Sequence, residues 1–105
     1  MEKVEGYVAY LQHWEESERG WGVRPDGLSM HPDEESAKLY RDRIIAINET
    51  PSGLGVPNEY DRPDGNLKKV VVTERLRDII LSKEGTFRVQ RSEVQHVRTD
   101  ILYGF

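Results

Sequence analysis

The chain is organised around one stretch, Gly20-Trp-Gly-Val-Arg-Pro-Asp-Gly-Leu-Ser-Met-His31. Its centre, Arg24-Pro-Asp-Gly27, predicts a tight turn, because proline presets φ at the second position and aspartate tolerates the third. The closing glycine can take the left-handed conformation of a bulge. The same four residues recur as Arg62-Pro-Asp-Gly65, and a strand-like segment and then a helix-like one follow each copy. We therefore expect two turns of the same chemistry, far apart along the chain.

The composition indicates one α+β domain over residues 1–105. Of the 105 residues, 36% are apolar and 32% are charged, which suits a modest core in a thin two-layer fold. A formal charge of -4 gives no net attraction to phosphate backbones or anionic lipid, which argues against nucleic-acid and membrane partners. Cysteine is absent, so disulfides and thiolate chemistry are excluded. Without a long apolar run or a signal-like start at Met1, we expect a cytoplasmic location.

Four segments have the β-branched, aromatic or alternating patterns of strands. They are Val4–Trp14, Trp21–Met30, Leu67–Val72 and Thr86–Gln90. The polar segment Glu15–Gly20 predicts a hairpin loop between the first two strands. Residues 49–66 contain three prolines and three glycines and predict a loop of unusual length, which is typical of functional or mobile segments.

Two main helices are predicted from their start signals and apolar spacing. Pro32 and three acidic residues mark the start of the first, which should end near Asn48, and Thr73 can cap the second, which should end before Gly85. Their apolar stripes are Ala37, Tyr40, Ile44 and Ile47 in the first and Leu76, Ile79 and Ile80 in the second. A capping-box pattern at Ser92 favours a short C-terminal helix over a strand.

We therefore expect an antiparallel sheet of about four strands, covered on one face by the two main helices. In that arrangement, the core is formed by the helix residues Tyr40, Ile44, Ile47, Leu76, Ile79 and Ile80 facing the strand residues Val8, Tyr10, Val71, Phe87 and Val89.

The candidate binding residues come from the two turns and their surroundings. They are Trp21, Arg24, Asp26, Tyr60, Arg62 and Asp64, together with the loop from Leu54 to Tyr60. Converging turns would present guanidinium groups to an anion, carboxylates to hydroxyls, and an indole as an interface anchor. The alternative is that Pro-Asp-Gly is only good turn chemistry, which does not require the preceding arginine.

No pattern in the sequence predicts a catalytic set, a cofactor or a metal. His13, His31 and His96 lack ligand spacing, and Gly53-Leu-Gly55 lacks the lysine and the strand-to-helix context of a phosphate loop. An acid/base pair of Asp26 and Asp64 would require burial and proximity, whereas turn tips are usually hydrated. The sequence thus favours binding over catalysis.

The motifs Trp21-Gly-Val-Arg-Pro-Asp-Gly-Leu-Ser-Met-His31 and Val56-Pro-Asn-Glu-Tyr-Asp-Arg-Pro63 resemble those of a family of short bacterial and phage proteins. The resemblance covers the middle half of the chain. It implies a phage or mobile-element origin and no particular activity.

Two functions follow as hypotheses. The first is a non-enzymatic interaction module that recognises a protein partner through the edge formed by Trp21, the arginines and the aspartates. The second is a site for a nucleotide or another small anionic metabolite, formed between copies in a homo-oligomer, in which arginines bind phosphate and Trp21 or Tyr60 stacks on the ring.

Overall fold

β1 lies at the centre of a five-stranded antiparallel sheet with the strand order β4-β2-β1-β3-β5. The computed structural model describes residues 6–18, 22–49 and 59–105, with nothing stated of the side chains of residues 17, 18, 48, 49, 59 and 60. The elements are β1 (Tyr7–Glu18), β2 (Gly22–His31), α1 (Glu34–Glu49), β3 (Glu59–Val72), α2 (Glu74–Ser82), β4 (Phe87–Val89), a 3-10 turn (Arg91–Glu93), α3 (Val94–Arg98) and β5 (Ile101–Tyr103). No helix in the described ranges is long and apolar enough to cross a membrane.

The second main helix begins after its predicted cap Thr73, and the first begins at Glu34, two residues after the predicted first position at Pro32. The Asp33 carboxylate accepts a hydrogen bond from the Ser36 amide at 2.7 Å, and the Thr73 hydroxyl accepts one from the Leu76 amide. After α2, Glu84 and Gly85 both adopt positive φ angles, 58° and 87°, which ends the helix. The predicted C-terminal helix is confirmed as α3, although no side chain caps its 3-10 entry.

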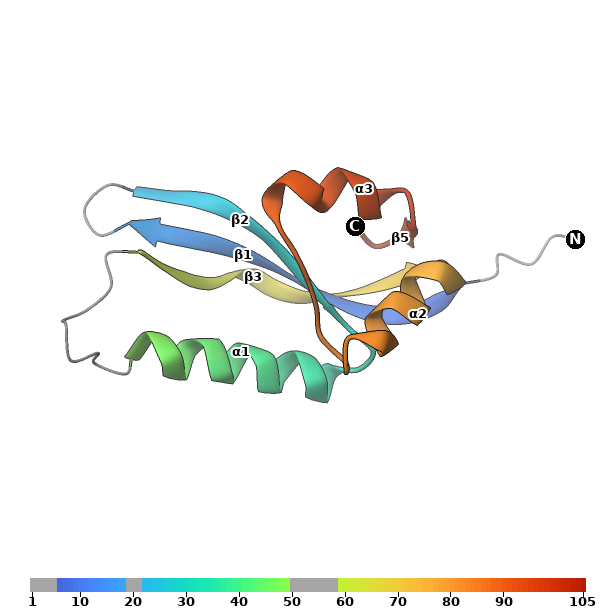
Figure 1. Ribbon diagram of the computed structural model, residues 1–105, viewed down its shortest axis with the longest axis horizontal. Helices are drawn as coiled ribbons and strands as arrows, with labels where there is room; N and C mark the ends of the chain where they lie inside the picture. The colour runs from blue at the N-terminus through green and yellow to red at the C-terminus, as the bar shows by residue number, and fades with distance from the viewer. Residues whose placement is uncertain (1–5, 19–21, 50–58) are drawn as a thin grey trace, which may run out of the picture.

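The two main helices lie on opposite faces of the sheet, so the prediction that both cover one face is wrong. In the strand register, Ala9 is opposite Val70 and Leu11 is opposite Met30, and these buried residues pack with Leu76 of α2. Residues that lie opposite each other on neighbouring strands share a face, whereas successive residues alternate. Trp14 therefore points to the other face, where it meets Tyr40 of α1. Figure 1 shows α1 and α3 on opposite sides of the sheet.

The main core accordingly differs from the predicted one. Phe87 and Val89 pair with Met30 and Leu28, which places them on the Leu11 face and away from Val8. Val8 and Ile47, both predicted to be core residues, are 47% and 59% exposed. The buried core cluster is Ala9, Leu11, Leu28, Met30, Val70, Val72, Leu76, Ile80, Val89 and Ile101.

The two Arg-Pro-Asp-Gly motifs are bulges inside strands, which corrects the prediction of turns. The β1–β2 register shifts between His13 and Glu15, opposite Asp26 and Gly27, and Gly27 has a φ of 83°. The β1–β3 register shifts next to Gly65, which has a φ of 76°. Proline and glycine are tolerated in edge strands and bulges. In the described chain, β4 pairs only with residues 28–30 of β2 and β5 only with residues 71 and 72 of β3, so both motifs lie at open edges of the sheet.

Several predicted boundaries also change. Glu15–Glu18 extend β1 and do not form a loop, and β3 begins at Glu59, so residues 59–66 of the predicted long loop are strand. Residues 50–58 of that loop, and Trp21 itself, lie outside the described residues. β5, which pairs with the end of β3, was not predicted.

Candidate functional site

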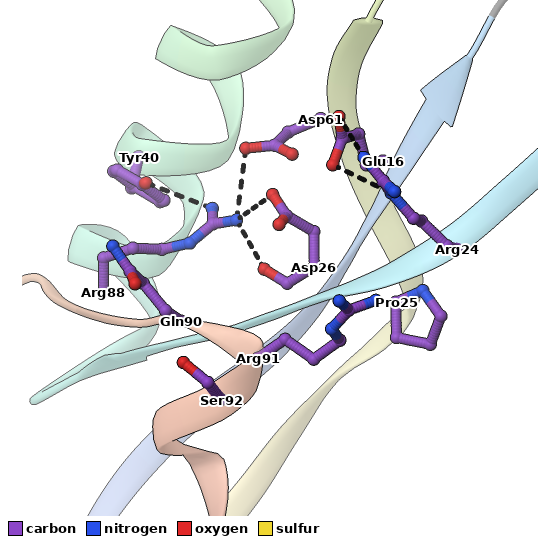
Figure 2. Close-up of a pocket in the computed structure, with 10 residues that line it drawn as sticks. All are labelled: Glu16, Arg24, Pro25, Asp26, Tyr40, Asp61, Arg88, Gln90, Arg91 and Ser92. Carbon is purple, nitrogen blue, oxygen red and sulfur yellow. Dashed lines mark hydrogen bonds and ion pairs between the residues drawn. The ribbon is translucent and has the colours of Figure 1, made fainter.

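A polar cleft of about 490 Å³ lies between α1, the three long strands and the segment that follows β4. Ten residues line it: Glu16, Arg24, Pro25, Asp26, Tyr40, Asp61, Arg88, Gln90, Arg91 and Ser92. Figure 2 shows these side chains converging from the β-strands, from α1 and from the chain after β4. The first Arg-Pro-Asp-Gly motif supplies three of them, and the second supplies none.

Arg88 is at the centre of the cleft, where it joins two carboxylates. Its Nη2 donates to Asp26 Oδ2 and to Asp61 Oδ2, each at 3.1 Å, and to the Asp26 carbonyl oxygen at 2.9 Å. Its Nη1 donates to the Tyr40 hydroxyl at 3.3 Å, and its guanidinium lies 5.1 Å from the centroid of the Trp14 ring. One cation thus fixes the relative positions of β2, β3, β4 and α1.

The two carboxylates share this single cation, and the pKa of Asp61 is raised, mainly because its carboxyl group is partly buried. Burial raises the pKa of Asp61 to about 6, with a further contribution from its side-chain hydrogen bond to Asp26. Arg88 opposes this shift but does not cancel it, because the negative charges of Asp26 and Glu16 add to the cost of ionising Asp61. The cleft therefore contains a carboxyl group whose pKa is raised to about 6 by its surroundings.

The enzyme hypothesis named a different carboxylate pair, and that pair is not formed. Asp64 lies opposite His13 in the β1–β3 register. His13 and Glu15 are on the same face of β1, and Asp64 does not line the cleft. Asp26 is instead next to Asp61, which immediately precedes the second motif in the sequence.

The arginines of the two motifs lie across β1 from each other but point to opposite faces. Arg24 pairs with Glu16, with Nε and Nη2 each 3.3 Å from a carboxylate oxygen, whereas Arg62 pairs with Glu15. Because Glu15 and Glu16 are successive strand residues, the two ion pairs are on opposite sides of the sheet. Arg24 lines the cleft, and Arg62 does not. The predicted single edge is therefore divided between two faces.

The other predicted binding residues cannot be placed at the side-chain level. Trp21 lies outside the described residues, and so does the side chain of Tyr60. Of the four predicted residues whose side chains the structure describes, Arg24 and Asp26 lie together in the cleft, and Arg62 and Asp64 do not line it.

Arg88, Asp61, Tyr40 and Arg91 were missed by the sequence analysis. Arg88 lies between the inward-facing Phe87 and Val89 of a predicted strand, and Tyr40 lies in a predicted apolar stripe, so no local pattern marks an ionic role for either residue. The side chain of Arg91 makes no ion pair or hydrogen bond with any other residue in the described ranges. Figure 2 shows its side chain extending toward β2 from the wall formed after β4.

A buried chain of hydrogen bonds supports the floor of the cleft. Trp14 Nε1 donates to Ser29 Oγ at 2.8 Å, and Ser29 Oγ is 2.8 Å from His31 Nε2. His31 Nδ1 is 3.1 Å from the Gly85 carbonyl, so this nitrogen carries the proton and Nε2 accepts from Ser29. Burial lowers the pKa of His31, which keeps the ring neutral. These contacts fix Trp14, on which Arg88 and Tyr40 pack.

Within the described ranges, no three histidine or acidic side chains are grouped so that they could hold a metal ion. The cleft is open and is lined by fixed donors and acceptors of both charges. Comparison of the chain with family models, curated proteins and solved structures finds no match.

Proposed function

We propose that the chain is a non-enzymatic binding module that recognises a protein partner through this cleft, and that the partner presents an extended peptide beside β2. One observation carries the proposal: the cleft coincides with a length of strand edge that has no neighbouring strand in the described chain. β4 pairs with β2 only from Leu28 to Met30, and the chain turns into the 3-10 segment after Gln90. Residues 22–27 of β2 are paired on the β1 side alone.

Addition of a strand to an open edge is a common way to bind a peptide, because main-chain hydrogen bonds give affinity and neighbouring side chains give specificity. Pro25 lacks an amide donor and the bulge distorts the edge, which disfavours indiscriminate strand pairing. Arg91 supplies a cation for an acidic side chain of the peptide. The motif resemblance supports a phage or mobile-element context for such a partner.

The two motifs provide a matched pair of variants for the test. Arg24→Ala and Arg62→Ala each remove the arginine of an Arg-Pro-Asp-Gly motif and break its ion pair to a glutamate of β1, and of these two residues Arg24 alone lines the cleft. The partner is captured from the native host with a photo-crosslinking residue in place of Ser92 and identified by mass spectrometry. We expect Arg24→Ala and Arg91→Ala to reduce capture strongly, and Arg62→Ala to leave it unchanged.

Hydrogen exchange on the purified complex then locates the contact. Successive strand amides point to opposite edges, so the peptide should protect the one of the Val23 and Arg24 amides that points away from β1, on the open part of β2. Equal loss of binding in the Arg24 and Arg62 variants, or a complex without protection in β2, would contradict the proposal.

A second candidate is a small anionic metabolite, such as a nucleotide, bound by Arg91 beside Tyr40. The observation in its favour is that Arg91 has no ionic partner in the described ranges. Arg24 and Arg62 of one chain do not bind the same phosphate in this version, because they are on opposite faces. A nucleotide panel that raises the melting temperature of the native chain but not of Arg91→Ala would favour the metabolite over the peptide.

A further inference from the structure

The open part of β2 has a different surface on each of its two faces. Arg24 lines the cleft, whereas Val23, the residue before it, does not. Because successive strand residues alternate, the side chain of Val23 points to the face away from the cleft. Val23 is 47% exposed there. Among the described helices, Figure 1 shows only α1 alongside the end of the sheet where β2 begins, and α1 is on the cleft side.

The surroundings of Val23 favour an apolar neighbour. On its face of the sheet, Glu15 is opposite Pro25 and forms an ion pair with Arg62, so these two charges already neutralise each other. A peptide side chain opposite Val23 would lie within contact distance of it, as cross-strand pairs do. An apolar side chain gains from this burial, whereas a charged one would lose hydration without a partner of its own.

The cleft face favours an acidic neighbour. Each of the three carboxylates that line the cleft already accepts a hydrogen bond from Arg24 or Arg88. The side chain of Arg91, which also lines the cleft, bonds to no acid in the described chain. A peptide residue opposite Arg24 shares its face, so its side chain enters the cleft that Arg91 lines.

We propose that the peptide recognised at this edge carries an apolar residue directly next to an acidic residue. The apolar residue lies opposite Val23, and the acidic residue lies opposite Arg24 and binds Arg91. The two must be adjacent in the peptide, because neighbouring residues of an added strand point to opposite faces of the sheet. This inference rests on the proposed function and adds the side chains that the edge selects.

A yeast-displayed library of random octapeptides, sorted for binding to the native chain and sequenced, tests the proposal. Enriched peptides should contain the adjacent apolar and acidic residues. On Val23→Lys, the apolar position should become acidic while the acidic position stays acidic. On Arg91→Glu, the acidic position should become basic while the apolar position stays apolar. A peptide selected on the native chain should bind each variant about tenfold more weakly.

Two matched variants control for general effects of charge. Val8→Lys makes the same substitution at a valine of equal exposure, 47%, which is opposite Val71 and distant from the open part of β2. Arg41→Glu makes the same substitution as Arg91→Glu at an exposed position of α1 that does not line the cleft. Both should keep the native preferences, and circular dichroism verifies that all four variants are folded.

Hydrogen exchange with an enriched peptide separates the two levels of the proposal. Peptides that protect residues 22–27 of β2 but lack the adjacent pair would overturn this inference and leave the peptide-binding function standing. An apolar preference that persists on Val23→Lys would do the same. If no enriched peptide protects β2, the proposed function fails and this inference fails with it.

Discussion

Asp61 shows how a single side chain can make the stability of this fold depend on pH. The ordinary pKa of an aspartate is 3.8, whereas burial and the neighbouring Asp26 raise that of Asp61 to about 6. Between these two values the folded chain binds more protons than the unfolded chain at this position. The contribution of Asp61 therefore favours folding at low pH and is lost as the pH rises through about 6.

The first prediction is that Asp61→Asn changes stability in a pH-dependent way. The free energy of unfolding of Asp61→Asn minus that of the native chain should be larger at pH 7 than at pH 4. The reason is that the amide cannot ionise and can still accept a hydrogen bond from Arg88. The measurement is urea denaturation of both proteins across this range.

The difference between the two proteins is the quantity to follow, because histidines act in the opposite direction. Burial lowers the pKa values of His13 and His31, so their contribution to stability is lost as the pH falls below their ordinary value of 6.5. That contribution is common to both proteins and cancels in the difference. Asp42→Asn, at an exposed position, is the control. A difference that is constant from pH 4 to pH 7 would rule out a displaced Asp61.

The second prediction concerns Ser29, which joins Trp14 to His31 in the buried chain. Ser29→Ala removes a hydroxyl and leaves the Trp14 N–H and His31 Nε2 without that partner, so it should cost about 2 to 3 kcal/mol of folding free energy. Ser82→Ala provides the comparison, because its hydroxyl is at the exposed end of α2 and donates only to the Ile79 carbonyl. Equal effects in denaturant titrations would show that the buried chain contributes little.

At the level of elements, the paired bulges show that identical sequences can have different structural roles. Gly27 and Gly65 both have positive φ angles, 83° and 76°. A Cβ added to Gly27 would lie 2.0 Å from the Val89 carbonyl oxygen, whereas one added to Gly65 meets no atom within 4 Å. The first bulge is thus packed against the end of β4, next to the cleft, and the second is open.

The third prediction follows from this contrast. Both Gly27→Ala and Gly65→Ala should lose about 1 to 2 kcal/mol from the left-handed backbone. Gly27→Ala should lose at least about 2 kcal/mol more, because the backbone of β4 must also move. Urea titrations of the two variants measure the difference directly, and indistinguishable midpoints would be inconsistent with the close packing at Gly27.

The elements that the sequence predicts well are those with local signals. The caps at Asp33 and Thr73 and the glycine after α2 depend on residues within a few positions, and the helices follow them. The Arg-Pro-Asp-Gly motifs were assigned wrongly because proline, aspartate and glycine satisfy the backbone of a bulge as well as that of a turn. The pairing of β2 and β3 with the two edges of β1 decides between a turn and a bulge, and that pairing is not local.

The same limit applies to the candidate site. Arg24 and Asp26 were found because they belong to a recognisable motif. The sheet brings Arg88 and Asp61 to Asp26. Arg88 is 62 residues from Asp26 along the chain and 27 residues from Asp61. A lone arginine in a strand and an aspartate just before an Arg-Pro-Asp-Gly motif carry no mark of this contact, so the site could be predicted only in part.

At the level of the whole molecule, one sheet separates two packed layers. α2 and the short α3 cover the face that contains Leu11, and α1 covers the face that contains Trp14. The sequence could not decide this arrangement, because β1 has apolar residues on both of its faces and a helix stripe fits either one. The consequence is that the cleft under α1 depends on a sheet whose larger core is on the other side.

The fourth prediction tests whether the two layers unfold together. Leu76 is fully buried in the core cluster and Leu81, in the same helix, is 54% exposed, so the two provide the same substitution in different surroundings. Leu76→Ala should cost about 2 to 5 kcal/mol, and Leu81→Ala should cost well under 1 kcal/mol. Because the strands are shared, Leu76→Ala should also reduce the hydrogen-exchange protection of the amides in α1, although that helix is on the opposite face. If α1 kept its native protection while α2 lost it, the cleft and the core would belong to separate folding units, and partner binding would survive damage to the core.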